Sequence, residues 1–263
     1  MTYITFLTDF GLQDDFVGVC RGVMRRIAPE ATVIDITHGI PPQAVRQGAI
    51  VLARSLPYMP VCVHLAVVDP GVGSERRAVA IRTREGRLLV GPDNGLLSLA
   101  APKDEIEEAR ALTNAHYHLE QVSHTFHARD VFAPVSAHLA AGAELADLGD
   151  AVDPATLVRI ALPQPEVARG VIHATVLGVD GFGNLELNVR AEHLTWERGT
   201  NVELCFELNR YYALLAETFA DAERGELLLF EDSYGAYSIA ISGGNAAKLT
   251  AAKPGDRVQI RRA

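Results

Sequence analysis

The stretch of sequence with the clearest potential for chemistry is the loop at residues 69–77. An apolar run at residues 64–68 ends in Asp69, a proline and two glycines, and Arg76 and Arg77 then precede a second apolar run at residues 78–81. This pattern predicts a strand, a tight loop and another strand. A carboxylate and a guanidinium would then lie at the carboxyl end of a strand, where open α/β sheets bind ligands. A well-made turn with a surface ion pair explains the same residues.

A second group of reactive side chains follows residue 125. His127 stands before Arg129 and Asp130 at an expected helix start, where backbone N–H groups could help to hold a ligand. A single histidine in such a place is either catalytic or structural. Arg129 and Asp130 are better explained as an internal ion pair or a helix cap than as participants in chemistry.

Two turn-like segments near the C-terminus combine polar and flat groups. Asp180, Phe182 and Asn184 alternate with glycines in a turn that could bind an amine and a ring. The glycines before Asn245 and Ala247 let a backbone approach a flat ligand closely. Both segments are also ordinary turn sequences, so ligand binding and chain reversal are alternative interpretations.

Four aspartates, Asp9, Asp35, Asp69 and Asp93, lie at or near the ends of apolar segments. In a parallel sheet they could gather along one edge, and Asp9, Asp35 and His38 could then bind a divalent metal in a hydrolase. No close-set ligand motif supports this, so a polar ligand-binding rim without metal is the preferred interpretation. The sequence has neither a Walker loop nor a Gly-x-Gly-x-x-Gly turn after a strand, so no phosphate-cradling cofactor is expected.

The elements that would position the first of these residues alternate in type. Apolar runs at residues 4–7, 33–37 and 64–69 predict strands, and residues 16–27 and 45–56 repeat apolar side chains at helical spacing between them. Strand, helix, strand, helix, strand is typical of an α/β domain with a parallel sheet and right-handed crossovers.

Beyond the loop, residues 88–91 predict a further strand, and residues 96–100 and about 131–141 predict helices. Residues 101–123 have no clear pattern. Prolines at positions 154, 163 and 165 accompany a change in composition. We therefore place a domain boundary there and expect an N-terminal domain at residues 1–165 and a C-terminal domain at residues 166–263.

The C-terminal part has the two-residue period of strands, separated by glycine-containing turns. A small antiparallel barrel or a sandwich is the expected outcome. The predicted strands are residues 172–176, 185–189, 202–208, 227–230, 237–241 and 257–260.

Composition excludes several classes of protein. The 263 residues are 48% apolar, enough for a substantial core, and the net charge of −9 argues against binding to nucleic acid or to anionic membranes. Cys20, Cys62 and Cys205 are few, distant and set in apolar patterns, as expected of buried thiols in a reducing cytoplasm. Residues 1–9 lack the features of a signal peptide, and no apolar run reaches transmembrane length, so we expect a cytoplasmic protein.

Taken together and in this order, six segments resemble motifs of the S-adenosylmethionine (SAM) hydroxide adenosyltransferases, which are relatives of the bacterial fluorinase and chlorinase. The resemblance spans nearly the whole chain. The segments are Thr8-Asp-Phe-Gly with Asp14 and Asp15, residues 69–76, Pro92-Asp-Asn-Gly, residues 125–130, residues 180–184, and the Gly-Asn-Ala-Ala that ends at Ala247.

The resemblance implies a Rossmann-like α/β sandwich domain followed by a C-terminal antiparallel β-barrel domain. It implies a homotrimer that binds SAM between the N-terminal domain of one subunit and the C-terminal domain of the next. The implied reaction is hydrolysis of SAM to adenosine and L-methionine, with no metal and no cofactor.

The resemblance also implies roles for single residues. Asp69, Arg76 and His127 correspond to the catalytic triad, and the motif spacing selects Arg76 over Arg77, which the loop alone does not. The implied substrate-binding residues are Asp9 for the ribose diol, Asp180 for the methionine amine, Asn184 with Asn245 and Ala247 for adenine, and Phe182, Ser233 and Tyr234 beside them.

Some positions depart from the halogenating relatives. Gln43 replaces a tryptophan over the ligand, and Ser233-Tyr234 replaces a serine-arginine pair that holds the methionine carboxylate. Halogenases lack the counterparts of Asp69 and Arg76, and a fixed carboxylate repels halide while it helps to hold water.

We therefore expect Asp69 to accept a hydrogen bond from the attacking water and Arg76 to fix Asp69. His127 would either complete this clamp or take the proton. The alternatives are a halogenase that uses chloride, a SAM- or adenosine-binding module without catalysis, and the metal-dependent hydrolase described above.

Overall fold

The computed structural model describes residues 3–207 and 209–263. Met1 and Thr2 of the N-terminal segment, and Leu208 of the strand predicted at residues 202–208, lie outside the described residues. The chain divides into two compact units, one that ends at Ile160 and one that comprises Ala161–Ala263. Each is described separately.

The first unit is built on a mixed sheet. Within residues 3–160, six strands pair in the order β2-β1-β3-β5-β4-β6. The β1, β2, β3 and β5 strands run parallel, so their carboxyl ends share one edge, whereas β4 is antiparallel to both β5 and β6. The strands are β1 Tyr3–Thr8, β2 Thr32–Thr37, β3 Val63–Val67, β4 Ala78–Thr83, β5 Leu88–Pro92 and β6 Ile106–Ala111.

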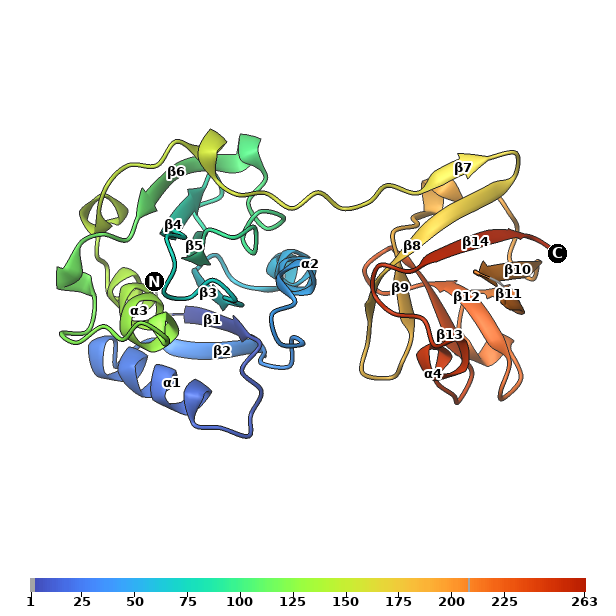
Figure 1. The fold of residues 1–263 in the computed structure, drawn as a ribbon, viewed down its shortest axis with the longest axis horizontal. Helices are drawn as coiled ribbons and strands as arrows, with labels where there is room; N and C mark the ends of the chain where they lie inside the picture. Colours follow the sequence, from blue (N-terminus) through green and yellow to red (C-terminus); the bar gives the residue numbers. More distant parts are fainter. Residues whose placement is uncertain (1–2, 208) are drawn as a thin grey trace. The chain divides into compact units, whose positions relative to one another are not determined.

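Helices cover both faces of this sheet (Figure 1). The helices α1 (Phe16–Ile27) and α3 (Ala133–Ala140) pack on one face, and α2 (Val45–Ser55) packs on the other. Successive strand residues alternate between the two cores: Phe6 faces α1 and α3, and Leu7 faces α2. The result is the Rossmann-like α/β sandwich that was predicted.

Several predicted boundaries shift. Residues 96–100 form turns instead of the predicted helix, and β6 lies in the stretch that showed no pattern. The helix predicted near residue 131 begins earlier, as a π-helical turn at Ala128–Phe132 that leads into α3. Short 3₁₀ turns are Leu56–Tyr58, Lys103–Glu105, Ala115–Tyr117, Leu145–Leu148, Pro154–Thr156, Ala191–His193 and Phe219–Asp221.

The second unit is a closed barrel. Pairing of β14 with β8 joins the ends of a sheet ordered β14-β10-β11-β12-β13-β9-β8, and the short β7 (Glu166–Ala168) extends β8 outside the ring. Among the described residues of this unit, β11 and β12 form the one parallel pair in the ring, which was not predicted. The strands are β8 Val171–Val179, β9 Leu185–Leu187, β10 Asn201–Phe206, β11 Asn209–Ala216, β12 Leu227–Glu231, β13 Tyr237–Ile241 and β14 Arg257–Arg262.

The barrel encloses its own apolar core. Inward-facing Leu204, Ile239 and Ile260 are fully buried, and a short helix, α4 (Ala246–Thr250), covers part of the barrel. The predicted β-barrel, as opposed to a sandwich, is therefore confirmed. In residues 3–207 and 209–263, no helix is both long and apolar enough to cross a membrane.

Candidate active site

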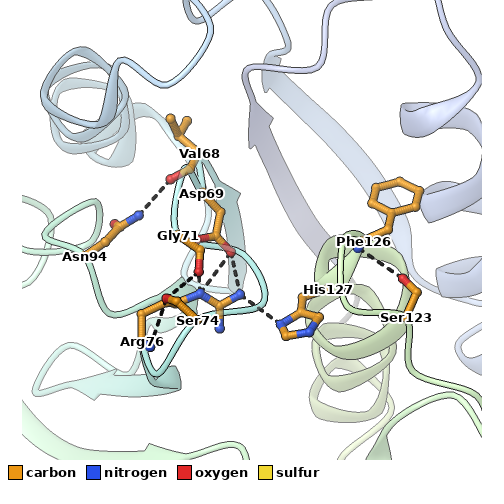
Figure 2. A network of polar contacts seen from close by, with 9 residues as sticks. All are labelled: Val68, Asp69, Gly71, Ser74, Arg76, Asn94, Ser123, Phe126 and His127. Atoms are coloured by element: carbon orange, nitrogen blue, oxygen red, sulfur yellow. Dashed lines mark hydrogen bonds and ion pairs between the residues drawn. The ribbon is translucent and has the colours of Figure 1, made fainter.

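The loop at residues 69–76 follows β3 directly and is held by short-range hydrogen bonds. The Val72 N–H donates to the Asp69 carbonyl at 3.2 Å, and the Ser74 N–H and Oγ both donate to the Gly71 carbonyl. From the neighbouring strand end, Asn94 Nδ2 donates to the Val68 carbonyl at 2.8 Å (Figure 2). The loop is thus ordered by backbone hydrogen bonds and by the side chains of Ser74 and Asn94.

One glycine brings this loop against a distant segment. Gly73 has a φ of +80°, and a Cβ placed there would lie 2.5 Å from the His124 carbonyl oxygen. Glycine alone fits both the backbone conformation and the close approach. The two segments therefore touch backbone to backbone, three residues before His127.

Arg76 joins Asp69 and His127. Its Nε lies 3.0 Å from both carboxylate oxygens of Asp69, its Nη2 also donates to Oδ2, and the same Nη2 lies 2.9 Å from His127 Nδ1 (Figure 2). The side chains of Arg76 and Asp69 are only 10% and 6% exposed. The pair is mostly buried, so the interpretation as a surface ion pair is wrong.

The contact with Arg76 fixes the protonation state of His127. A guanidinium has donors only, so His127 Nδ1 must accept, and the proton of the neutral ring sits on Nε2. Burial, and after it the positive charge of Arg76, lowers the pKa of His127, against smaller opposing effects of Asp69 and Asp130. At neutral pH the ring therefore offers an N–H donor at Nε2.

Asp130 anchors the segment that carries His127. Its carboxylate is fully buried and accepts from the Ser123 N–H at 2.9 Å and from Arg129 Nε at 2.6 Å. Burial opposes ionisation, but the hydrogen bonds from Arg129 and Ser123 outweigh it and lower the pKa of Asp130. The predicted internal ion pair between Arg129 and Asp130 is confirmed.

Arg77 points elsewhere. Its Nε donates to Asp93 Oδ2 at 2.9 Å, and its two Nη atoms donate to the side chain and the carbonyl of Thr156. Asp93 Oδ1 accepts in turn from the Val158 N–H at 2.8 Å. Of the two neighbouring arginines, Arg76 is therefore the one that meets Asp69.

Asp9 lies at the same edge of the sheet. In the β1–β3 ladder Thr8 is opposite Val67, so Asp9 and Asp69 follow adjacent strand ends. Asp9 Oδ2 accepts from the Gln43 N–H at 2.8 Å, and Gln43 takes a φ of +66° to make this contact. Gln43 thus supports Asp9 through its backbone.

The proposed metal ligands have other partners. Asp35 forms an ion pair with Arg21, and His38 lies between Asp35 Oδ1 at 3.1 Å and Thr8 Oγ1 at 2.8 Å. Burial, and after it Arg21, lowers the pKa of His38 to about 4. Within the part of the chain that the structure describes, no three His, Cys, Asp or Glu side chains are grouped so that they could hold a metal ion.

The candidate residues of the barrel form a compact turn. Asp180 Oδ1 accepts from the backbone N–H groups of Phe182 and Asn184 at 2.9 Å each, and Oδ2 accepts from Asn184 Nδ2 at 2.8 Å. Asn184 is buried, whereas Phe182 is 81% exposed. The turn therefore presents an aromatic ring beside a fixed carboxylate.

This turn meets the loop of the second barrel motif. The Ala247 N–H donates to the Gly183 carbonyl at 2.9 Å, and Asn245 Oδ1 caps α4 by accepting from the Lys248 N–H at 2.7 Å. Gly183 has a φ of +88°, and a Cβ there would collide with the Asn245 side chain. Two motifs far apart in sequence thus form one surface.

Ser233 and Tyr234 lie in a different turn. It joins β12 to β13, and Asp232 Oδ1 accepts from the Tyr234 N–H at 2.8 Å. Asn245 and Ala247 follow the opposite end of β13. The structure therefore does not place Ser233 and Tyr234 in the same turn cluster as the other barrel candidates.

Two residues that sequence reasoning passed over support the triad. Asn94 belongs to a noted motif but had no assigned role, and its amide fixes the strand end before Asp69. The ring of Phe132 lies under the Arg76 guanidinium, with 5.2 Å between Arg76 Cζ and the ring centroid. An apolar residue five positions after His127 gives no chemical signal in the sequence.

The fold and this cluster define a class: two-domain proteins with a Rossmann-like α/β domain, an acid–arginine–histidine site at the edge of its sheet, and a closed β-barrel domain. Residues 4–149 match the SAM hydroxide adenosyltransferase N-terminal domain, and residues 174–259 match the corresponding C-terminal domain. The chain belongs to the SAM hydroxide adenosyltransferase family.

Individual relatives agree with this assignment. The (R)-S-adenosyl-L-methionine hydrolase of Salinispora tropica is 48% identical over 260 residues, which cover 98% of this chain and 97% of the relative. A fluorinase of an Actinoplanes species is 29% identical over 267 residues, 90% of each chain. The crystal structure of an uncharacterized conserved protein from Thermotoga maritima has a TM-score of 0.92 at 37% identity, with 98% and 100% of the two chains covered.

Proposed function

We propose that this protein hydrolyses S-adenosyl-L-methionine to adenosine and L-methionine by attack of water or hydroxide at the ribose C5′ carbon. The observation that carries the proposal is that one mostly buried guanidinium, that of Arg76, binds both the Asp69 carboxylate and His127 Nδ1. Relatives named (R)-S-adenosyl-L-methionine hydrolase support the choice of substrate.

Displacement at C5′ of SAM requires an aligned nucleophile but no general acid. The sulfonium of SAM is positively charged and leaves as a neutral thioether, so no acid has to protonate the leaving group. Water is a poor nucleophile, so the site must align it with C5′ and keep it from exchanging hydrogen bonds with bulk solvent. A clamp of one fixed acceptor and one fixed donor meets that demand.

The triad supplies both groups. Asp69 keeps lone pairs beyond those bound by Arg76 and accepts a hydrogen bond from the water. His127 donates its Nε2–H to the water oxygen. Because Arg76 already occupies Nδ1, His127 acts as part of the clamp and not as the proton acceptor. As the C5′–O bond forms and the C5′–S bond breaks, the water proton moves along its hydrogen bond to the Asp69 carboxylate and from there to solvent. A fixed carboxylate beside the nucleophile disfavours halide.

Further parts of the proposal extend beyond the triad. Asp9 binds the ribose diol, Asp180 binds the methionine amine, and Asn184 with the loop of Asn245 and Ala247 contacts adenine. Phe182 contacts the substrate beside them. Ser233 and Tyr234, in the turn between β12 and β13, are the remaining proposed substrate-binding residues. No metal and no cofactor takes part.

We also propose a cytoplasmic homotrimer whose sites lie at subunit interfaces, without nucleic-acid or membrane partners. The net charge of −9 supports the absence of nucleic-acid and membrane partners. Light scattering on the purified protein tests the oligomeric state: a mass of three chains is expected, and a monomer that retains full activity would contradict sites completed by a second subunit.

The decisive experiment is incubation of the purified protein with SAM and chloride in water enriched in ¹⁸O, run in parallel with and without excess chelator. Adenosine labelled at its 5′-hydroxyl, together with unlabelled methionine, is expected by mass spectrometry. A 5′-chloronucleoside would instead identify a halogenase, and bound but uncleaved SAM would identify a binding module. Loss of activity in chelator would identify a metal-dependent hydrolase.

A further inference from the structure

Arg76 has a third contact, which is not polar. Its Cζ lies 5.2 Å from the centroid of the Phe132 ring, within the range of a cation–π interaction, and Phe132 is fully buried. The guanidinium is thus bounded by a carboxylate, an imidazole and the face of an aromatic ring, with 10% of the side chain exposed. Desolvation strengthens each of these electrostatic contacts.

The π-helical turn explains how His127 and Phe132 reach the same guanidinium. Five residues separate them, and in an α-helix five residues rotate a side chain by about 140° beyond a full turn. Here the Ala133 N–H donates to the Ala128 carbonyl, the bonding of a π-helix, which widens the turn by one residue. Residues five apart then lie nearly one above the other, so both side chains face Arg76.

We propose that Phe132 is a positioning residue for the reaction, held by this π-helical turn so that its ring face fixes the plane of the Arg76 guanidinium. The inference rests on the proposed function, because its consequence is the alignment of Asp69 and His127 around the attacking water.

The hydrogen bonds of Arg76 explain why its guanidinium needs the Phe132 ring to hold its plane. Nη2 serves both Asp69 Oδ2 and His127 Nδ1, so a small rotation of the guanidinium strengthens one contact and weakens the other. The Asp69 carboxylate binds the guanidinium from one side, and without an opposing contact it would pull the guanidinium toward Asp69. A ring face beneath the plane opposes tilting, and an aliphatic side chain of similar volume lacks the negative face that attracts the cation.

Graded fluorination of the ring tests this without changing its shape. Phenylalanine with one, two or three fluorine atoms is incorporated at position 132 of the full-length protein, because each fluorine weakens the negative potential of the ring face. The matched control is the same series at Phe6, which is also fully buried and belongs to the same apolar core, and whose ring packs against His38.

The expected result is a stepwise fall of kcat at position 132, about tenfold for the trifluoro ring, with KM for SAM within about twofold. The control series at position 6 is expected to leave kcat unchanged. Equal behaviour of the two series, or a flat series at position 132, overturns the proposal, since a residue that merely fills the core responds to volume and not to ring charge.

A second readout does not depend on turnover. The pKa of His127, measured by NMR titration of the ring proton, should rise toward its ordinary value as fluorination at position 132 loosens Arg76. If the unmodified protein does not cleave SAM, the proposed reaction fails, and this titration still decides the inference. A rise confined to position 132 supports it, and an unchanged pKa of His127 overturns it.

Discussion

Arg76 and Arg77 are adjacent in the chain, and each binds an aspartate that follows a β-strand, yet their surroundings differ. Arg76 lies over Phe132 on the side of α3 and shares Nη2 between Asp69 and His127. Arg77 projects to the other face and uses its donors on Asp93 and on both polar groups of Thr156. Successive residues of an extended chain point to opposite faces, which accounts for the separation.

The two ion pairs are similar in type but differ in the groups around them, and therefore in what they can do. The partners of Arg77 are backbone and structural groups, and they attach the segment around residues 156–158 to the sheet. The partners of Arg76 are an acceptor and an imidazole, each of which keeps a free hydrogen-bonding position. Only the second arrangement can bind another molecule.

The largest effect is expected from Asp69→Asn, which tests whether the Arg76 site is the functional one. The substitution keeps the size of the side chain but removes its charge. We expect turnover of SAM to fall by about a thousandfold or more, because the water loses its fixed anionic acceptor. Calorimetric binding of SAM should remain measurable. Turnover within tenfold of the parent protein would rule out the clamp.

The paired variants Arg76→Lys and Arg77→Lys compare the two sites directly. A lysine cannot chelate a carboxylate and bind His127 with one planar group, so Arg76→Lys should lower kcat by about a hundredfold. Arg77→Lys should leave kcat within about twofold and lower the free energy of unfolding in urea by about 1–2 kcal/mol. The opposite assignment of effects would mean that Arg77 is the functional residue.

The pH dependence of kcat sharpens the comparison, because a histidine contacts Arg76 whereas the partners of Arg77 are Asp93 and Thr156. Since the pKa of His127 is lowered, its ring stays neutral as pH falls to 6.5, and activity should decline only below that value, when protonation removes the acceptor for Arg76. His127→Asn should lower kcat and abolish this acidic limb. A decline that starts above pH 7 would contradict the lowered pKa.

The smallest effect on turnover is expected from two histidines outside the triad. The pKa values of His38 and His64 are lowered to about 4, in both cases chiefly by burial, so the unfolded chain binds more protons than the folded one between pH 6.5 and 4. Stability is therefore complete above pH 6.5 and falls as pH decreases to 4, by up to about 3 kcal/mol for each residue.

Urea unfolding at a series of pH values measures this loss. In His64→Gln the dependence should be shallower, with kcat at pH 7.5 unchanged per folded molecule. His64 is the suitable choice because its ring binds Thr5 within the sheet, without contact with the triad. A free energy of unfolding that is constant between pH 6.5 and 4 would show that neither ring is held neutral.

The sequence predicts the alternating first half of the fold well, because apolar periodicity determines it. It fails where tertiary contacts determine the local structure. Residues 96–100 are apolar except for Ser98 and form turns, in which Ser98 Oγ donates to the Gly95 carbonyl and accepts from the Ile160 N–H. The strands β6 and β11 escaped notice because charged and polar side chains lie along them.

The candidate site divides in the same way. Asp69 can be found from its loop alone, since residue types mark the end of a strand. The choice between Arg76 and Arg77 cannot, because it depends on which face each side chain takes. His127 joins the site only through the tertiary fold, and Phe132 has no polar group that would mark it.

The geometry of the site depends on the absence of a Cβ atom at Gly73. Its contact with the His124 carbonyl sets how closely the loop of Asp69 approaches the segment of His127. Any side chain at position 73 would push the two segments apart and leave every reactive group intact but out of reach of the others. In a screen of all single substitutions, position 73 would therefore tolerate as little change as Asp69, Arg76 and His127. Sequence variation at this position would be restricted although glycine carries no functional group.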